Sequence, residues 1–257
     1  MATRPNFFLG LKLSHCPIYR GFVCELQKNF ANEFPHLSRC MVPPEKIHLT
    51  MFVLSLEQYQ ISSAVDCLLS CQEEVDNILF SKKEIDFTNI RFSRVGRFGE
   101  RVLFHAPAED AAFGKVREVF SAVQGRFITA GLMNSGEKDI LKWDPHCTIA
   151  KTSADKKYGK KRKLTGRNVQ YIEDYIRIQC PQFINGVNVS LSTIDLLEMT
   201  KVDISTGYYK SHSNVYLSVP EKRDRGKDSP KSMRMQFNPE YLASVSCHVL
   251  TLDGSLK

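Results

Sequence analysis

The chain has 257 residues, 42% of them hydrophobic and 10% aromatic, which is an ordinary composition for a soluble globular protein with a substantial core. No stretch approaches the ~20 apolar residues that a membrane-spanning helix needs. Residues 1–6 lack the apolar block of a secretory signal, so we expect an intracellular protein without a membrane span.

The formal net charge of +7 is consistent with an anionic partner, but much of it lies in two basic segments, residues 156–163 and 222–231. Runs of like charge are more often solvated loops than binding patches. Residues 160–163 also match the weak pattern of a nuclear-import signal. We therefore expect a cytoplasmic protein that also enters the nucleus if this signal acts.

Eight cysteines are scattered along the sequence without a Cys-x-x-Cys pair. This usage is typical of reduced, buried thiols, and the sequence does not cluster Cys or His residues as a zinc site requires. We expect neither a metal nor a cofactor.

Hydrophobic spacing predicts the order strand, helix, strand twice along the chain. The first copy occupies residues 6–13, 18–34 and 47–54. The second copy occupies residues 102–105, 113–127 and 146–150. Because a supersecondary unit recurs, we expect an α+β fold with two pseudo-symmetric lobes around a central cleft, each lobe a sheet with helices on its outer face.

The remaining elements extend this unit to about residue 218. A further helix is expected over 61–79, with more strands near 85–95, 189–197 and 213–218. Residues 221–234 are dominated by charge, which is typical of a disordered linker. We therefore expect a folded domain at 5–218 and, at 219–257, a charged linker with a short tail.

Both motif strands carry the same tripeptide form, His48-Leu49-Thr50 and His146-Cys147-Thr148. Side chains alternate along a strand, so each strand presents a histidine and a threonine on one face and turns Cys147 away from them. An imidazole has an unperturbed pKa of about 6.5 and transfers protons near neutral pH. Two imidazoles facing one phosphate divide the roles of base and acid without a metal. This pattern predicts a phosphodiesterase with His48, Thr50, His146 and Thr148 as catalytic residues.

Three further residues are candidates for substrate contacts. Lys46 falls on the face of His48, where its ammonium would neutralise phosphate charge, although a solvent-facing lysine fits equally well. Tyr208 and Tyr209 would stack on a nucleobase, with core packing as the alternative. Asp144 falls on the face of His146, but Pro145 favours a turn there. The other histidines lack the repeated context and are expected to be surface or packing residues: His15, His36, His105, His212 and His248.

Four segments together carry a family resemblance: Pro5-Asn6-Phe7-Phe8-Leu9, His48-Leu49-Thr50-Met51, Pro145-His146-Cys147-Thr148 and Gly207-Tyr208-Tyr209. They resemble the two-histidine (2H) phosphoesterase superfamily and, within it, the central-domain family of A-kinase anchoring protein seven. The resemblance covers about residues 5–218. It implies a bilobal, LigT-like fold that binds AMP-type nucleotides, with family members cleaving 2′,5′-linked oligoadenylate. It also implies that His48 and His146 are the acid-base pair, while Thr50 and Thr148 bond phosphate oxygens.

The expected function is that of a monomeric, metal-independent 2′,5′-phosphodiesterase acting on 2′,5′-oligoadenylate. Two alternatives stay open: a cyclic nucleotide phosphodiesterase acting on RNA ends, and a non-catalytic scaffold of the A-kinase anchoring kind that binds an AMP-type nucleotide. The family's long amphipathic helix for the protein kinase A regulatory subunit is not recognisable in the tail, so that partner is the less favoured expectation. Which histidine is the acid, and whether the product is a cyclic phosphate, also stays open.

Overall fold

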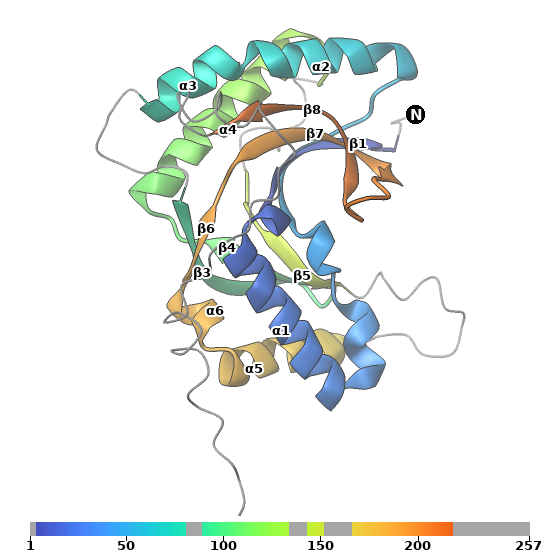
Figure 1. Cartoon of the computed structure of the whole chain (residues 1–257), viewed down its shortest axis with the longest axis vertical. Coiled ribbons are helices and arrows are strands. Elements are labelled where there is room, and N and C mark those ends of the chain that lie inside the picture. The colour runs from blue at the N-terminus through green and yellow to red at the C-terminus, as the bar shows by residue number, and fades with distance from the viewer. Residues whose placement is uncertain (1–3, 81–88, 134–142, 152–165, 218–257) are drawn as a thin grey trace, which may run out of the picture. The chain divides into compact units, whose positions relative to one another are not determined.

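The structure is a computed structural model that describes residues 4–80, 89–133, 143–151 and 166–217 (Figure 1). All of these residues belong to one compact unit, Met1–Pro220. Both basic segments and the tail at 219–257 lie outside the described residues, so the expectations for them stay predictions. Within the described part of the chain, no helix is long and apolar enough to cross a membrane.

Eight strands form one antiparallel sheet in the order β6-β3-β4-β5-β2-β1-β7-β8. Their bounds are β1 Phe7–Lys12, β2 His48–Leu54, β3 Asn89–Phe98, β4 Val102–Pro107, β5 Cys147–Lys151, β6 Val187–Ser190, β7 Thr193–Val202 and β8 Tyr209–Tyr216. In the described residues, the central strands β2 and β5 pair with each other only at Leu49 and Cys147. The sheet therefore consists of two four-stranded halves joined at its centre.

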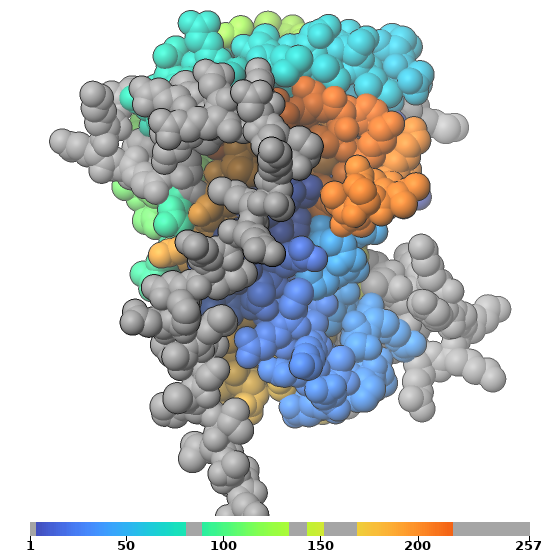
Figure 2. Space-filling model, viewed as in Figure 1, coloured from blue at the N-terminus to red at the C-terminus, as the bar shows by residue number. Residues whose placement is uncertain are grey.

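The helices form two layers, one for each half of the sheet (Figure 1). One layer holds α2 (Ile61–Ser70), α3 (Gln72–Phe80) and α4 (Ala111–Thr129). The other holds α1 (Pro17–Glu33), α5 (Gly166–Gln179) and α6 (Gln182–Asn185). The space-filling view shows α2 and α3 at the top and α1 at the bottom (Figure 2). The expected α+β class with helices outside the sheet is confirmed.

The helix of each strand-helix-strand unit covers the opposite half of the sheet. Helix α1 follows β1 of the first half, but its Tyr19 packs on Phe92 of β3, with ring centroids 5.3 Å apart. Helix α4 follows β4 of the second half, but its Phe127 packs on Phe52 of β2 at 5.4 Å. This exchange interlocks the two halves, because each buries its apolar face under a helix from the other.

The predicted strand-helix-strand order is confirmed in both copies, and two other predictions are wrong in detail. The helix expected over 61–79 is two helices, because the amide of Cys71 bonds the carbonyl of Leu68, a turn tighter than an α-helix. The strand expected at 189–197 is the pair β6 and β7. The sequence reasoning also missed α5, although Val169, Ile172 and Ile176 keep helical spacing and are buried.

Candidate active site

The two motif strands place all four predicted catalytic residues on one face of the sheet. Leu49 and Cys147 pair across the centre and are both fully buried. Antiparallel pairing around this point sets His48 across from Thr148, and Thr50 across from His146. Alternation turns these four half-buried side chains to the face opposite Leu49 and Cys147. We call this surface the histidine face.

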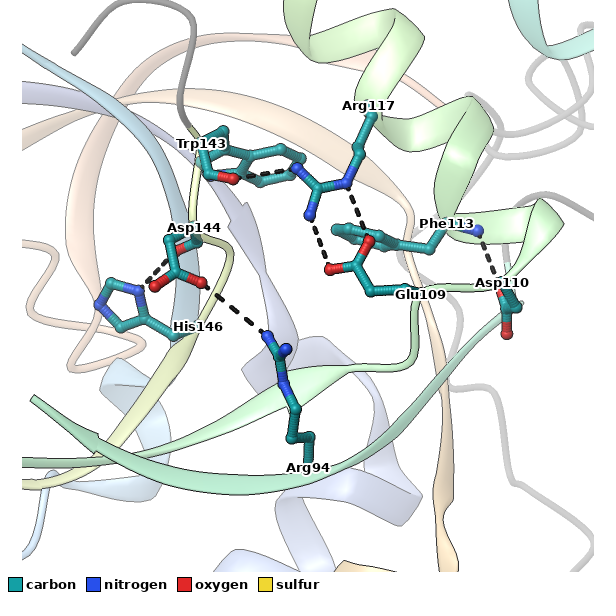
Figure 3. A network of polar contacts seen from close by, with 8 residues as sticks. All are labelled: Arg94, Glu109, Asp110, Phe113, Arg117, Trp143, Asp144 and His146. Atoms are coloured by element: carbon teal, nitrogen blue, oxygen red, sulfur yellow. Dashed lines mark hydrogen bonds and ion pairs between the residues drawn. The ribbon is translucent and has the colours of Figure 1, made fainter.

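Each imidazole of the histidine face is held by the same kind of hydrogen bond. Nδ1 of His48 lies 2.7 Å from the carbonyl oxygen of Lys46, and Nδ1 of His146 lies 2.8 Å from that of Asp144 (Figure 3). A carbonyl only accepts, so Nδ1 carries the hydrogen in both rings and Nε2 of a neutral ring keeps a free lone pair. The two histidines are therefore in the same tautomer, with Nε2 available for proton transfer. The backbone of Asp144, not its carboxylate, orients His146.

Aromatic rings surround His48. Phe8 lies 4.9 Å from it between centroids, and Tyr209 meets it edge-on at 5.5 Å. Burial among these rings lowers the pKa of His48 to about 4, while its hydrogen bond to the Lys46 carbonyl opposes the shift and the charges of Lys151 and His146 add to it. His48 is therefore neutral at pH 7 and suited to accept a proton.

His146 lies in a similar aromatic setting in the second half of the sheet. Phe98 is 4.6 Å away and 38% exposed, and Phe104 is 5.6 Å away. Gly96 is required beneath them, because a Cβ there would come within 2.6 Å of the Phe104 ring. The Arg94 guanidinium lies 3.9 Å from the Asp144 carboxylate, next to His146 (Figure 3). A cation and an open aromatic face therefore adjoin this imidazole.

The three predicted substrate residues differ in their positions. The ammonium of Lys46 lies 5.7 Å from the centre of the Tyr209 ring, and Tyr209 contacts His48, so both adjoin the first imidazole. Tyr208 is only 1% exposed and packs with Phe8 and Leu197. A ring enclosed in this way has no free face for a nucleobase, so the stacking role expected for Tyr208 does not fit, and the packing alternative does.

Sequence reasoning missed Lys12. It is the cross-strand partner of His48 in the β1–β2 pair, and such partners share a face. Its ammonium lies 4.3 Å from the centre of the Tyr208 ring; burial lowers the pKa of Lys12, and the carboxylates of Asp195 and Asp203 oppose this shift. Only the register between β1 and β2 reveals this cation beside the first imidazole.

Trp143, the single tryptophan of the chain, was also missed. Its indole Nε1–H donates to the carbonyl oxygen of Thr50 at 2.8 Å, and its ring stacks on Phe120 at 4.6 Å. Arg117 donates to the Trp143 carbonyl at 2.9 Å and forms an ion pair with Glu109 (Figure 3). These contacts anchor the segment that leads into the second motif. A lone tryptophan in a sequence gives no sign of such a partner.

The charged groups that adjoin the two imidazoles are mainly cationic. Lys12 and Lys46 lie on the His48 side and Arg94 on the His146 side, an arrangement that suits an anionic ligand such as a phosphodiester. Residues 4–80, 89–133, 143–151 and 166–217 contain no group of three or more His, Cys, Asp or Glu side chains placed to hold a metal ion.

A sheet that joins two His-x-Thr strands at its centre, with both imidazoles on one face, places the protein in the two-histidine phosphoesterase superfamily. Residues 5–217 match the family described as the AKAP7 2'5' RNA ligase-like domain, and the chain belongs to that family.

One curated relative is the A-kinase anchor protein 7 isoform gamma of Homo sapiens, 25% identical over 233 residues. That match covers 90% of this chain and 62% of the relative, so the chain spans less than two thirds of the relative's length. Among solved structures, E. coli LigT complexed with 3'-AMP aligns at a TM-score of 0.45 and 13% identity, over 84% of this chain and 99% of that one. TT0787 of Thermus thermophilus aligns at 0.48 and 17% identity, over 82% and 97%. Both TM-scores are below 0.5, and the family assignment rests on the match to residues 5–217.

Proposed function

We propose that the protein is a metal-independent 2′,5′-phosphodiesterase that cleaves 2′,5′-linked oligoadenylate, with His48 and His146 as its proton-transfer pair. The observation that carries the proposal is the presence of two imidazoles on one face, each held through Nδ1 with Nε2 free. Membership of a phosphoesterase family supports the reaction class. The 2′,5′ linkage rests on the family resemblance.

In the proposed reaction, His48 is the base and His146 the acid. Nε2 of neutral His48 accepts the proton of the nucleophile as its oxygen bonds to phosphorus. Protonated His146 then donates a proton to the leaving 5′ oxygen as its bond to phosphorus breaks. The nucleophile is either water or the 3′-hydroxyl beside the linkage, and the product distinguishes them: a linear phosphate from water, a 2′,3′-cyclic phosphate from the hydroxyl.

The neighbouring side chains would bind the phosphate and its two nucleosides. Thr50 and Thr148 each lie across the strand pair from a histidine, where their hydroxyls donate to non-bridging phosphate oxygens. Lys12 and Arg94 supply positive charge on the two sides. The rings of Tyr209 and Phe98, beside His48 and His146, offer stacking surfaces for the two bases.

The test compares cleavage of 2′,5′- and 3′,5′-linked triadenylate by the purified full chain, with products resolved by mass spectrometry. We expect faster cleavage of the 2′,5′ linkage, since the position of the flanking hydroxyl decides whether attack aligns with the leaving oxygen. The rate should persist in excess chelator. Equal rates on both linkages would indicate general RNA processing, and loss of activity in chelator that Zn²⁺ or Mn²⁺ restores would contradict the two-histidine mechanism.

A second candidate is a nucleotide-binding scaffold without turnover, which the match to an A-kinase anchor protein favours. Isothermal calorimetry with AMP separates the two. Tight AMP binding together with no cleavage of either triadenylate would support the scaffold, whereas product release would support the enzyme.

A further inference from the structure

Behind the histidine face, a chain of buried polar groups runs through the second half of the sheet. The Tyr19 hydroxyl lies 3.0 Å from Nδ1 of His105, and Nε2 of His105 lies 2.8 Å from the carbonyl oxygen of Phe183. Because that carbonyl only accepts, Nε2 of His105 carries the hydrogen and Nδ1 accepts from Tyr19. Tyr19 and His105 are both 0% exposed, so neither bond has water as an alternative partner.

The chain continues from Tyr19 to both motif strands. The Cys147 thiol hydrogen-bonds Tyr19 and the backbone of His48. Since the Tyr19 hydrogen is given to His105, the Tyr19 oxygen accepts from the thiol, and the Cys147 sulfur accepts from the amide of His48. Four bonds therefore follow one direction, from the His48 amide to the Phe183 carbonyl, and each group has one donor and one acceptor partner.

This chain meets the motif strands at the weakest point of the sheet. Strands β2 and β5 pair with each other only at Leu49 and Cys147 within the described residues. Apolar packing is non-directional, whereas a hydrogen bond fixes distance and angle. The bonds of Cys147 therefore fix the relative placement of the residues beside it, His146 on its own strand and His48 across from it.

We infer that Tyr19 and His105 are positioning residues, which set the separation and orientation of the His48 and His146 imidazoles through Cys147. This inference deepens the proposed function and rests on it for its effect on catalysis. Its effect on the geometry of the imidazoles stands independently of turnover.

The first test is Tyr19→Phe in the full chain. The variant keeps the ring that packs on Phe92 and removes only the hydroxyl. We expect kcat for triadenylate cleavage to fall about tenfold with KM within about twofold, because small displacements of proton-transfer groups slow chemistry more than binding. The matched control is Tyr175→Phe, which removes a hydroxyl from a ring packed on Phe30 and Phe34, away from the motif strands. It should leave both constants unchanged.

The second readout does not need turnover. Side-chain ¹⁵N spectra of the His48 and His146 rings, followed against pH, should change in Tyr19→Phe and match the wild type in Tyr175→Phe. Cys147→Ala should have the same effect as Tyr19→Phe, and the double variant should be no worse than either alone, because both interrupt one chain. Cys147→Ser, which keeps a donor and an acceptor, should restore most of kcat.

The outcomes separate the two claims. A wild type that cleaves neither triadenylate while Tyr19→Phe still shifts both ring signals overturns the proposed function and leaves the positioning role intact. Tyr19→Phe with the ring signals and kcat of Tyr175→Phe overturns the positioning role, as does additivity of Tyr19→Phe and Cys147→Ala. If Tyr19→Phe does not fold, the Cys147→Ala and Cys147→Ser pair decides by the same criteria.

Discussion

The indole of Trp143 and the backbone of Thr50 are joined by a hydrogen bond of 2.8 Å, with Nε1–H as donor and the carbonyl oxygen as acceptor. This bond ties the segment before His146 to the middle of the first motif strand. It complements the single Leu49–Cys147 pair, so the two motifs are held together on both sides of the strand junction.

Trp143→Phe should therefore impair both stability and activity. The variant leaves the Thr50 carbonyl without its donor, which we expect to cost about 1–2 kcal/mol in the free energy of unfolding and to slow cleavage. Urea unfolding followed by circular dichroism measures the first effect, because the chain has no other tryptophan for fluorescence. Tyr59→Phe, at a site that is 77% exposed, is the control. A Trp143→Phe protein as stable and active as this control would contradict the role of the bond.

Replacing either imidazole should remove a whole proton-transfer step. We expect His48→Ala and His146→Ala each to lower kcat by ~10²-fold or more, with the fold retained, and Thr50→Ala and Thr148→Ala to lose less. Triadenylate cleavage measures the rates and circular dichroism the fold. His36→Ala, at an exposed position, should keep the wild-type rate. Near-normal turnover without either histidine of the pair would refute the assignment.

The pH dependence of cleavage should show the lowered pKa of His48. As the base, His48 must be neutral, and its pKa of about 4 means that kcat/KM stays high from neutral pH down to about pH 5. It should fall below about pH 4 as His48 gains a proton, and fall on the alkaline side as the general acid loses its own. Initial rates between pH 3.5 and 9 test this. An acid limb at the ordinary imidazole value of about 6.5 would show that His48 is not the neutral base.

Stability should decline on acidification because of buried His105. Burial lowers its pKa to about 4, whereas in the unfolded chain it titrates near the ordinary value of about 6.5. Between these values only the unfolded state binds the proton, so the free energy of unfolding falls by about 2–3 kcal/mol as the pH drops from 6.5 to 4. Urea titrations across this range should show a flatter dependence in His105→Gln. The exposed control His36→Gln should keep the wild-type slope, and an equally steep slope in His105→Gln would contradict this account.

Deletion of residues 219–257 should leave folding and cleavage unchanged, because every described element and all of the site residues lie within Met1–Pro220. Thermal unfolding and triadenylate cleavage by the truncated chain measure both. A pull-down of the protein kinase A regulatory subunit provides the opposing result. Sub-micromolar binding by the full chain that is lost on truncation would assign anchoring to the tail.

The sequence by itself determined the local features. Strand alternation put each histidine and threonine of a motif on one face, and the recurring strand-helix-strand order indicated two related halves, because both patterns depend on neighbouring residues. Helix α5 was within reach of the same reasoning, since Val169, Ile172 and Ile176 keep helical spacing, but they follow a highly charged segment that obscured them.

Only the tertiary structure decided how distant residues meet. The Leu49–Cys147 pair, which brings the two motifs together, is a matter of register between strands about 100 residues apart, and no local pattern encodes it. The same holds for Lys12 beside His48, for the Trp143 bond to Thr50 and for the enclosure of Tyr208. His105 looked like any isolated histidine, and it became part of a polar chain only because α1 crosses to the other half of the sheet and brings Tyr19 to it. Such contacts are fixed by which surfaces are buried together, and that depends on the whole chain at once.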